Sequence, residues 1–233
     1  MTIDPLRPLL LGSGSPRRRE ILGALGIPIR VAKADIDETP LPGEDAESYL
    51  VRIVADKLAA VQRLPDVQGA AGVLVADTSV IAGGAVLGKP ADAEEARSML
   101  RSLSGRDHEV WTRFAVAAAG PVAGAAGAAV AAGAPGLIAS ESPARPRRRR
   151  DGANTRVVFR ALGEDEIAAY AATGEGLDLG AGAYAIQGIG AFAVERIEGS
   201  YSNVVGLPAC EVVVALRRAA LLGPFPRFEA SPR

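Results

Sequence analysis

The chain has 233 residues, of which 48% are hydrophobic and 23% charged; this size and composition predict a single globular domain spanning 1–233. The formal net charge of -1 excludes a general attraction to nucleic acid or to an anionic membrane. The only cysteine, Cys210, excludes a disulfide framework and a cysteine metal cluster, and we expect it to be a small buried side chain. The first residues lack a secretory pattern, so we expect a cytoplasmic protein.

The first predicted unit is a strand, a tight loop and a helix start, written LLLGSGSPRRR at residues 9–19. Ser15 suits a helix N-cap and Pro16 the first helical position. Free amides, hydroxyls and guanidiniums then meet in one small volume, and arginine matches phosphate oxygens bidentately. We interpret this loop as a phosphate site; the alternative is an ordinary cap with solvated arginines.

A short strand is predicted at residues 29–33, followed by an acidic loop that contains Glu38 and by a helix at residues 44–62. Helical spacing of the apolar residues places Lys57 at one edge of the buried stripe. Lysine is rare here, with three among 26 basic residues. A compact point charge is therefore expected where lysine does occur, as beside a phosphate or a metal.

A buried strand is predicted at residues 72–76, with Asp77 and Thr78 at its carboxyl end, where open α/β sheets present site residues. A hairpin follows at residues 80–87. Residues 83–89 spell the P-loop pattern GxxxxGK. We interpret them as a hairpin that ends in Lys89, because Pro90 stands where the magnesium-binding Ser or Thr belongs.

The remaining predicted elements mix helices and strands throughout, so the fold class is α/β. His108, the only histidine, starts a strand, and no GxSxG motif accompanies it, which favours a structural or surface histidine over a catalytic one. The predicted helices are 91–103, 164–172 and 208–222, and the predicted strands are 109–118, 157–161 and 192–197.

No residue from Phe114 to Ser140 is charged, and an arginine run follows at 145–150. We interpret residues 119–152 as an enlarged, disordered loop, and we also expect a short flexible C-terminal tail. A membrane span is the alternative, but small residues and two prolines argue against it. The arginine run lacks interleaved aromatics, so nucleic-acid binding is not expected.

Three groups of motifs together resemble the Maf family of nucleoside triphosphate pyrophosphatases. They are SGSPRR at residues 13–18, ADT at 76–78 with LGKP at 87–90, and AGAYAIQG at 181–188 with VVGLP at 204–208. The resemblance covers nearly the whole chain apart from the alanine-rich loop and the last residues. It implies a mixed twisted sheet flanked by helices around a central phosphate-binding cleft, related to inosine triphosphate pyrophosphatases and often dimeric.

The resemblance also implies a reaction, in which a nucleoside triphosphate is cleaved between the α and β phosphates with a divalent metal, Mg²⁺ or Mn²⁺. Arg17, Thr78 and Gln187 match the branch that acts on dTTP and UTP. The 7-methyl-GTP branch has an aromatic residue, Gln and Glu at these three positions. Three further hypotheses stay open: a modified pyrimidine substrate, a pyrophosphatase of another nucleotide specificity such as 7-methyl-GTP, and a non-catalytic regulator of septum formation, the role from which the family takes its name.

Roles for individual residues follow from the same resemblance for Asp77 as proton acceptor and for the two lysines, and from side-chain chemistry for the metal, phosphate and base contacts. Asp77 is expected to accept the proton of the attacking water, and Glu38 and Asp77 to hold the metal; which role Asp77 mainly plays stays open. Lys57 and Lys89 would neutralise developing charge. Thr78 and Gln187 would contact the base. The phosphate chain would be held by Ser13, Ser15, Arg17 and Arg18.

The chain departs from the family pattern at one place close to a motif. Family members commonly have Asp-Lys before AGAY, whereas this chain has Asp178-Leu179-Gly180. The lysine is missing and one residue is added. If that lysine helps to bind phosphate, we expect either lower activity or a replacement charge from an arginine elsewhere.

Overall fold

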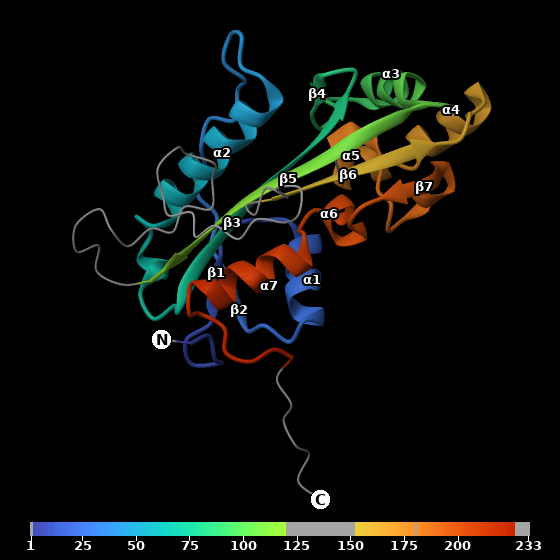
Figure 1. The fold of residues 1–233 in the computed structure, drawn as a ribbon. Helices are drawn as coiled ribbons and strands as arrows, with labels where there is room; N and C mark the ends of the chain where they lie inside the picture. Colours follow the sequence, from blue (N-terminus) through green and yellow to red (C-terminus); the bar gives the residue numbers. More distant parts are fainter. Residues whose placement is uncertain (1, 120–151, 180, 227–233) are drawn as a thin grey trace, which may run out of the picture.

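A twisted mixed sheet of seven strands runs through the molecule (Figure 1). The computed structural model describes residues 2–119, 152–179 and 181–226. The sheet order is β2-β1-β3-β5-β6-β7, and β4 pairs with β3 outside this path. The α/β class predicted from the sequence is therefore confirmed.

The first half of the sheet is parallel and contains β1 (Leu9–Leu11), β2 (Ile29–Val31) and the start of β3 (Gly72–Ala82). All three leucines of β1 are fully buried, because a parallel strand is covered on both faces. Helix α1 (Pro16–Ala24) connects β1 to β2. Its first turn therefore lies beyond the carboxyl end of β1.

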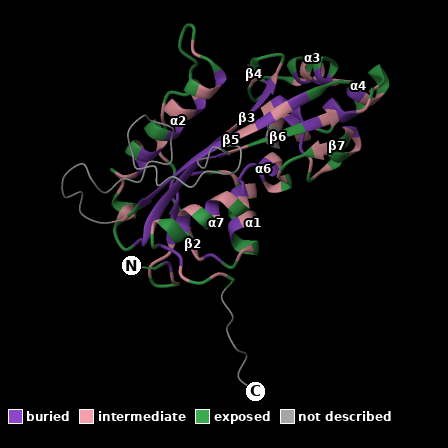
Figure 2. Cartoon of the chain, in the orientation of Figure 1, coloured by how far each residue is buried: buried purple, intermediate pink, exposed green. Residues whose placement is uncertain are grey.

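The second half of the sheet is antiparallel. It consists of β4 (Ala85–Leu87), β5 (Asp107–Ala118), β6 (Gly152–Phe159) and β7 (Val194–Glu198). The β3–β4 turn is the predicted hairpin, and both Gly83 and Gly84 have positive φ, which glycine adopts without steric cost. Figure 2 shows buried residues concentrated along the central strands.

Helices cover both faces of the sheet. Helix α2 (Ala46–Val61) packs on β3 and β5, whereas α7 (Ala209–Arg218) lies on the side of α1. The far end of the sheet carries α3 (Ala93–Leu103), α4 (Glu164–Ala172) and α5 (Glu175–Leu179). The short elements are η1 (Pro65–Val67), η2 (Ala181–Ala183), η3 (Ile189–Ala193) and α6 (Tyr201–Val205).

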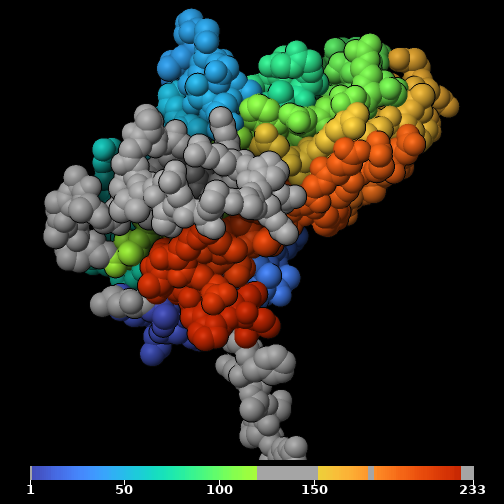
Figure 3. Space-filling model, in the orientation of Figure 1, coloured from blue at the N-terminus to red at the C-terminus, as the bar shows by residue number. Residues whose placement is uncertain are grey.

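The first described residues lie beside the segment that follows α7. The amide of Ile3 donates to the carbonyl of Leu221 at 2.7 Å, and α1 contacts α6. In the space-filling view the blue atoms of the first residues border the red atoms of α7 (Figure 3). The contact between α1 and α6 brings the SGSPRR loop to the VVGLP segment.

The structure corrects the predicted end of the third strand. β3 does not stop at Ala76 but continues to Ala82, because β5 pairs with it from residue 72 to residue 81. Asp77 and Thr78 therefore lie inside a long strand. They are still accessible from one side because the neighbour β1 ends earlier, with Leu11 opposite Leu74.

Several smaller expectations also change. Helix α7 ends at Arg218 instead of residue 222, and the short helices α5 and α6 were not predicted. Cys210 is exposed rather than buried, since it lies in the first turn of α7 on the side away from the buried residues Val212 and Leu216. His108 is buried, with 2% of its surface exposed, in agreement with a structural role.

Predictions for the alanine-rich region and the C-terminal tail fall mainly on residues 120–151 and 227–233, outside the described residues. Residues 114–118 of the uncharged segment form the end of β5. Among the helices that the structure describes, none has the length and apolar character needed to cross a bilayer.

Candidate active site

Arg18 is the buried centre of the predicted phosphate loop. From the first turn of α1, its Nε donates to the carbonyl of Gly206 at 2.9 Å, and its Nη1 donates to Ser13 Oγ at 2.9 Å and to the carbonyl of Ala76 at 2.8 Å. Its Nη2 donates to Thr78 Oγ1 at 3.2 Å. Burial lowers the pKa of this guanidinium, which nevertheless stays charged. Arg18 thus joins the loop, β3 and the VVGLP segment.

Arg17, the preceding residue, is directed differently. Its Nε donates to the carbonyl of Val205 at 3.0 Å, and it lines a pocket together with Ser15 and Arg18. Burial lowers its pKa, opposed by the charge of Glu20. Ser15 is the N-cap residue of α1, as predicted, but its hydroxyl makes no capping hydrogen bond. Arg17 and Ser15 therefore present donors to the pocket.

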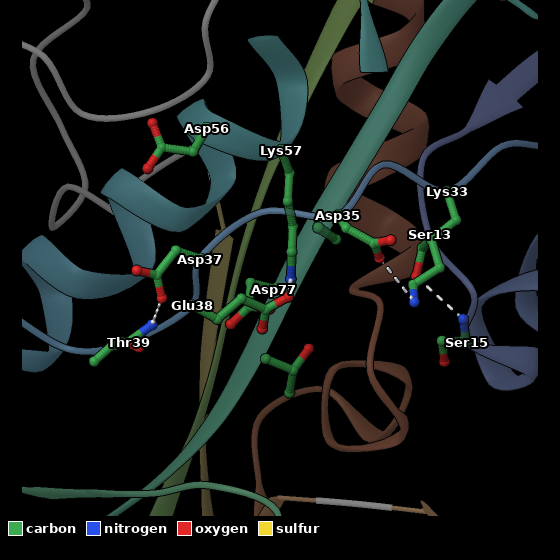
Figure 4. A network of polar contacts seen from close by, with 12 residues as sticks. Ser13, Ser15, Lys33, Asp35, Asp37, Glu38, Thr39, Asp56, Lys57 and Asp77 are labelled. Atoms are coloured by element: carbon green, nitrogen blue, oxygen red, sulfur yellow. Dashed lines mark hydrogen bonds and ion pairs between the residues drawn. The ribbon is translucent and has the colours of Figure 1, made fainter. Parts of the chain in front are cut away.

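Lys57 joins two carboxylates from different parts of the chain. Its Nζ lies 2.6 Å from Asp77 Oδ1 and 3.0 Å from Glu38 Oε1. Figure 4 shows the lysine reaching from α2 toward Asp77 on β3 and Glu38 in the loop after β2. The side chains of Lys57 and Asp77 are only 14% and 12% exposed, so solvent screens their attraction weakly.

Two residues of α2 hold the loop that carries Glu38. The hydroxyl of Tyr49 donates to the carbonyl of Glu38 at 3.2 Å, and Arg52 Nη2 donates to the carbonyl of Thr39 at 3.0 Å. Burial, followed by the charges of Asp77 and Glu38, raises the pKa of Tyr49 to about 12. Tyr49 was not singled out from the sequence, and its place on the same predicted helix as Lys57 was the available signal.

The donor set suits a hard divalent cation. Two carboxylates from different elements approach the same ammonium group. Magnesium usually binds one or two carboxylates and completes its shell with water and substrate phosphates. No group of three acidic, histidine or cysteine side chains suited to a metal occurs among the described residues. The residues therefore fit a metal that is shared with a phosphate chain.

The second part of the site is a pocket between β3, α6 and the turn after η2. Arg17 and Gln187 both line it, so the structure brings together the first and last of the predicted motifs. Thr78 lies on the wall, where its Oγ1 is 2.9 Å from Thr112 Oγ1 and donates to the carbonyl of Gly206 at 3.2 Å. The wall residues outside the quoted motifs are Val80 and Val110. The motifs themselves supply further wall residues to which no individual role was assigned from the sequence: Ala181, Tyr184, Ala185, Ile186, Val204, Val205 and Gly206.

Lys89 is separate from these groups. It is exposed after β4, and it forms no hydrogen bond or ion pair with the part of the chain that the structure describes. The preceding Gly88 is anchored, because its carbonyl accepts from the amide of Gly182 at 3.0 Å. The structure therefore groups Lys57 with Glu38 and Asp77, but it does not bring Lys89 into contact with them.

The family model described as Maf-like protein matches residues 8–219. The chain belongs to the Maf family. A protein of Anaeromyxobacter dehalogenans strain 2CP-C named dTTP/UTP pyrophosphatase is 46% identical over 91% of this chain and 93% of the relative. A Myxococcus xanthus protein of the same name is 47% identical over 91% of this chain and 93% of its own length.

A solved structure also matches part of this Maf protein. The nucleoside-triphosphatase / dITP/XTP pyrophosphatase of Mycobacterium abscessus aligns with 48% of this chain and 65% of that chain, at 11% identity and a TM-score of 0.28. A similarity of this size adds nothing to the description of the fold. The motif departure at residues 178–180 lies in and after α5, and its side chains are outside the described part of the molecule.

Proposed function

We propose that this Maf protein hydrolyses dTTP and UTP to the nucleoside monophosphate and pyrophosphate. The observation that carries the proposal is one pocket that Arg17, Thr78 and Gln187 line together, although the three residues are far apart in the chain. Asp77 immediately precedes Thr78 on β3 and is paired with Lys57. A nucleotide in this pocket would thus have its phosphate chain close to the carboxylates.

The charged groups have complementary tasks in this reaction. Arg17 and Ser15 bind the phosphate chain, while Arg18 keeps the loop in place through Ser13. Asp77 accepts the proton of the attacking water through Oδ2, because Oδ1 is engaged by Lys57. When bound by Glu38 and Asp77, a divalent cation would neutralise charge on the triphosphate.

The base is read at the other end of the pocket. The side-chain amide of Gln187 has both a donor and an acceptor, which matches the alternating donor and acceptor groups of a uracil or thymine imide edge. The hydroxyl of Thr78 is occupied by protein contacts. Thr78 therefore shapes the wall, and Gln187 supplies the discriminating contact.

The test is pyrophosphate release from dTTP, UTP, CTP, ATP, GTP and 7-methyl-GTP, with Mg²⁺, with Mn²⁺ and with a chelator. We expect release from dTTP and UTP that requires a metal and falls by about a thousandfold in Asp77→Asn. Asp56→Asn is the matched control, because this carboxylate lies next to Lys57 in sequence but is 51% exposed and pairs with Arg52.

Each outcome of this panel has a clear meaning. Preference for 7-methyl-GTP would show that the specificity assignment is wrong, although the reaction would stand. No release from any nucleotide by folded protein would overturn the enzymatic proposal. Full activity in Asp77→Asn would remove Asp77 as the proton acceptor.

A further inference from the structure

The turn that carries Gln187 is held from outside the pocket. Residues 185–188 form the turn, closed by the amide of Gly188, which donates to the carbonyl of Ala185 at 3.1 Å. Gln187 is the third residue of this turn and is exposed. A side chain at an exposed turn keeps a fixed direction only if the backbone on both sides is anchored.

Two residues, Tyr170 near the end of α4 and Glu175 at the start of α5, supply that anchor. Glu175 Oε1 accepts from the amide of Ile189 at 2.9 Å, and Glu175 Oε2 accepts from the amide of Gly190 at 2.9 Å. Tyr170 donates its hydroxyl to Glu175 Oε2 at 2.7 Å and accepts from the amide of Ala185 at 3.2 Å. The Tyr170–Glu175 pair, which we call the carboxylate clamp, therefore holds the turn at both ends.

Glycines allow the clamp to close. A Cβ at Gly188 would collide with Glu175 Oε1, and one at Gly190 would lie 2.6 Å from the Tyr170 hydroxyl. Tyr170 is 3% exposed, which removes water as a competing partner. Burial raises the pKa of Glu175, but hydrogen bonds from Tyr170, Gly190 and Ile189 outweigh it and lower the pKa overall. The carboxylate is thus charged at neutral pH, when charge-assisted bonds to backbone amides are strongest.

We propose that Glu175, supported by Tyr170, is a positioning residue for base selection, acting through Gln187. This inference rests on the proposed function, in which Gln187 reads the base. Glu175 lines no part of the pocket wall itself. Its effect is to fix the amides that follow Gln187, and a misplacement of about 1 Å can cost about a hundredfold in rate.

The test is Glu175→Gln, which keeps the shape of the side chain but turns an acceptor oxygen into a donor facing a backbone amide. We expect KM for UTP to rise about tenfold with kcat within about threefold, and the preference for UTP over GTP in kcat/KM to fall about tenfold. Glu195→Gln is the matched control, an exposed glutamate of β7 that should change neither value.

A double-mutant cycle separates positioning from general stability. In a Gln187→Ala background, Glu175→Gln should leave the UTP/GTP preference unchanged within about twofold, because the group through which it acts is gone. Additive effects on this preference, or an unchanged preference in Glu175→Gln alone, would overturn the proposal. Tyr170→Phe provides the same readout if Glu175→Gln does not fold.

Hydrogen exchange distinguishes this result from failure of the proposed function. Glu175→Gln should accelerate exchange at the amides of Ile189 and Gly190, whether or not the protein is active. A wild-type chain without pyrimidine hydrolysis would overturn the proposed function and the role in base selection together. An active wild-type chain whose amides exchange equally fast in the variant would overturn the clamp alone.

Discussion

The two ends of the pocket are stabilised in different ways. At the phosphate end, charged groups are paired inside the protein: Lys57 with two carboxylates, and Arg18 with backbone carbonyls and hydroxyls. At the base end the buried groups are neutral, and the rings of His108, Phe159 and Tyr184 pack edge to face with centroids 4.8–5.5 Å apart. His108 Nε2 also bonds the hydroxyl of Tyr184 at 2.9 Å.

The two ends of the pocket therefore respond to different perturbations. Buried charges lose a great deal when one partner is removed, because the other stays desolvated. A neutral aromatic cluster loses little from a change in charge elsewhere, but it resists protonation of its histidine.

Arg18→Leu should produce the largest loss, a decrease of about 4 kcal/mol in the free energy of unfolding. The carbonyls of Ala76 and Gly206 and the hydroxyl of Ser13 would lose their common donor while remaining buried. Urea denaturation measures the change. Arg19→Leu, at an exposed position of the same helix, is the control and should stay within about 0.5 kcal/mol. Equal effects of the two variants would contradict the role given to Arg18.

Acid should destabilise the base end through His108. Burial lowers its pKa from 6.5 to about 4, so the unfolded chain takes up the proton first as the pH falls. The contribution of neutral His108 to the free energy of unfolding is therefore fully present above about pH 6.5. It decreases toward pH 4 at about 1.4 kcal/mol per pH unit, a loss of about 3 kcal/mol.

The measurement for His108 is the free energy of unfolding against pH, compared with His108→Gln. The variant should have a flatter profile between pH 4 and pH 6.5, whatever its stability at neutral pH. An unchanged slope would show that another group controls the acid transition.

Lys57→Gln should lower kcat/KM for dTTP by about a hundredfold, equivalent to about 2.7 kcal/mol. The ammonium that holds Asp77 and Glu38 together would be lost, and the two carboxylates would repel each other. Steady-state pyrophosphate release measures this effect. Activity within about threefold of wild type would show that the lysine is only a structural partner of the carboxylates.

Arg17→Ala should give the smallest effect, a rise of about tenfold in KM for both dTTP and UTP with little change in their ratio. Its guanidinium lines the pocket, whereas Arg19 is exposed, so Arg19→Ala is the matched control. A change in base preference would contradict the division between a phosphate end and a base end.

Local signals in the sequence were sufficient for most elements and for the family. Proline and serine mark the start of α1, Asp45 and Asp92 cap α2 and α3 with side-chain hydrogen bonds, and two glycines form the β3–β4 turn. These features depend on neighbouring residues, so a pattern in the sequence is enough to predict them. The motif order likewise indicated the Maf family before any contact was known.

Only the tertiary structure decided how far β3 extends and which charged groups meet. β3 continues past Asp77 because β5 pairs with it, and pairing between distant strands leaves no local signal. Arg17 and Arg18 are adjacent in one motif and both line the pocket, yet Arg18 is buried and bridges the carbonyls of Gly206 and Ala76, whereas Arg17 is half-buried and donates to the carbonyl of Val205. Likewise, the sequence determined that Lys57 and Asp77 occur in suitable elements, whereas the packing of α2 on β3 determined that they form an ion pair. Burial and long-range hydrogen bonds are properties of the folded chain, and they assign different tasks to identical side chains.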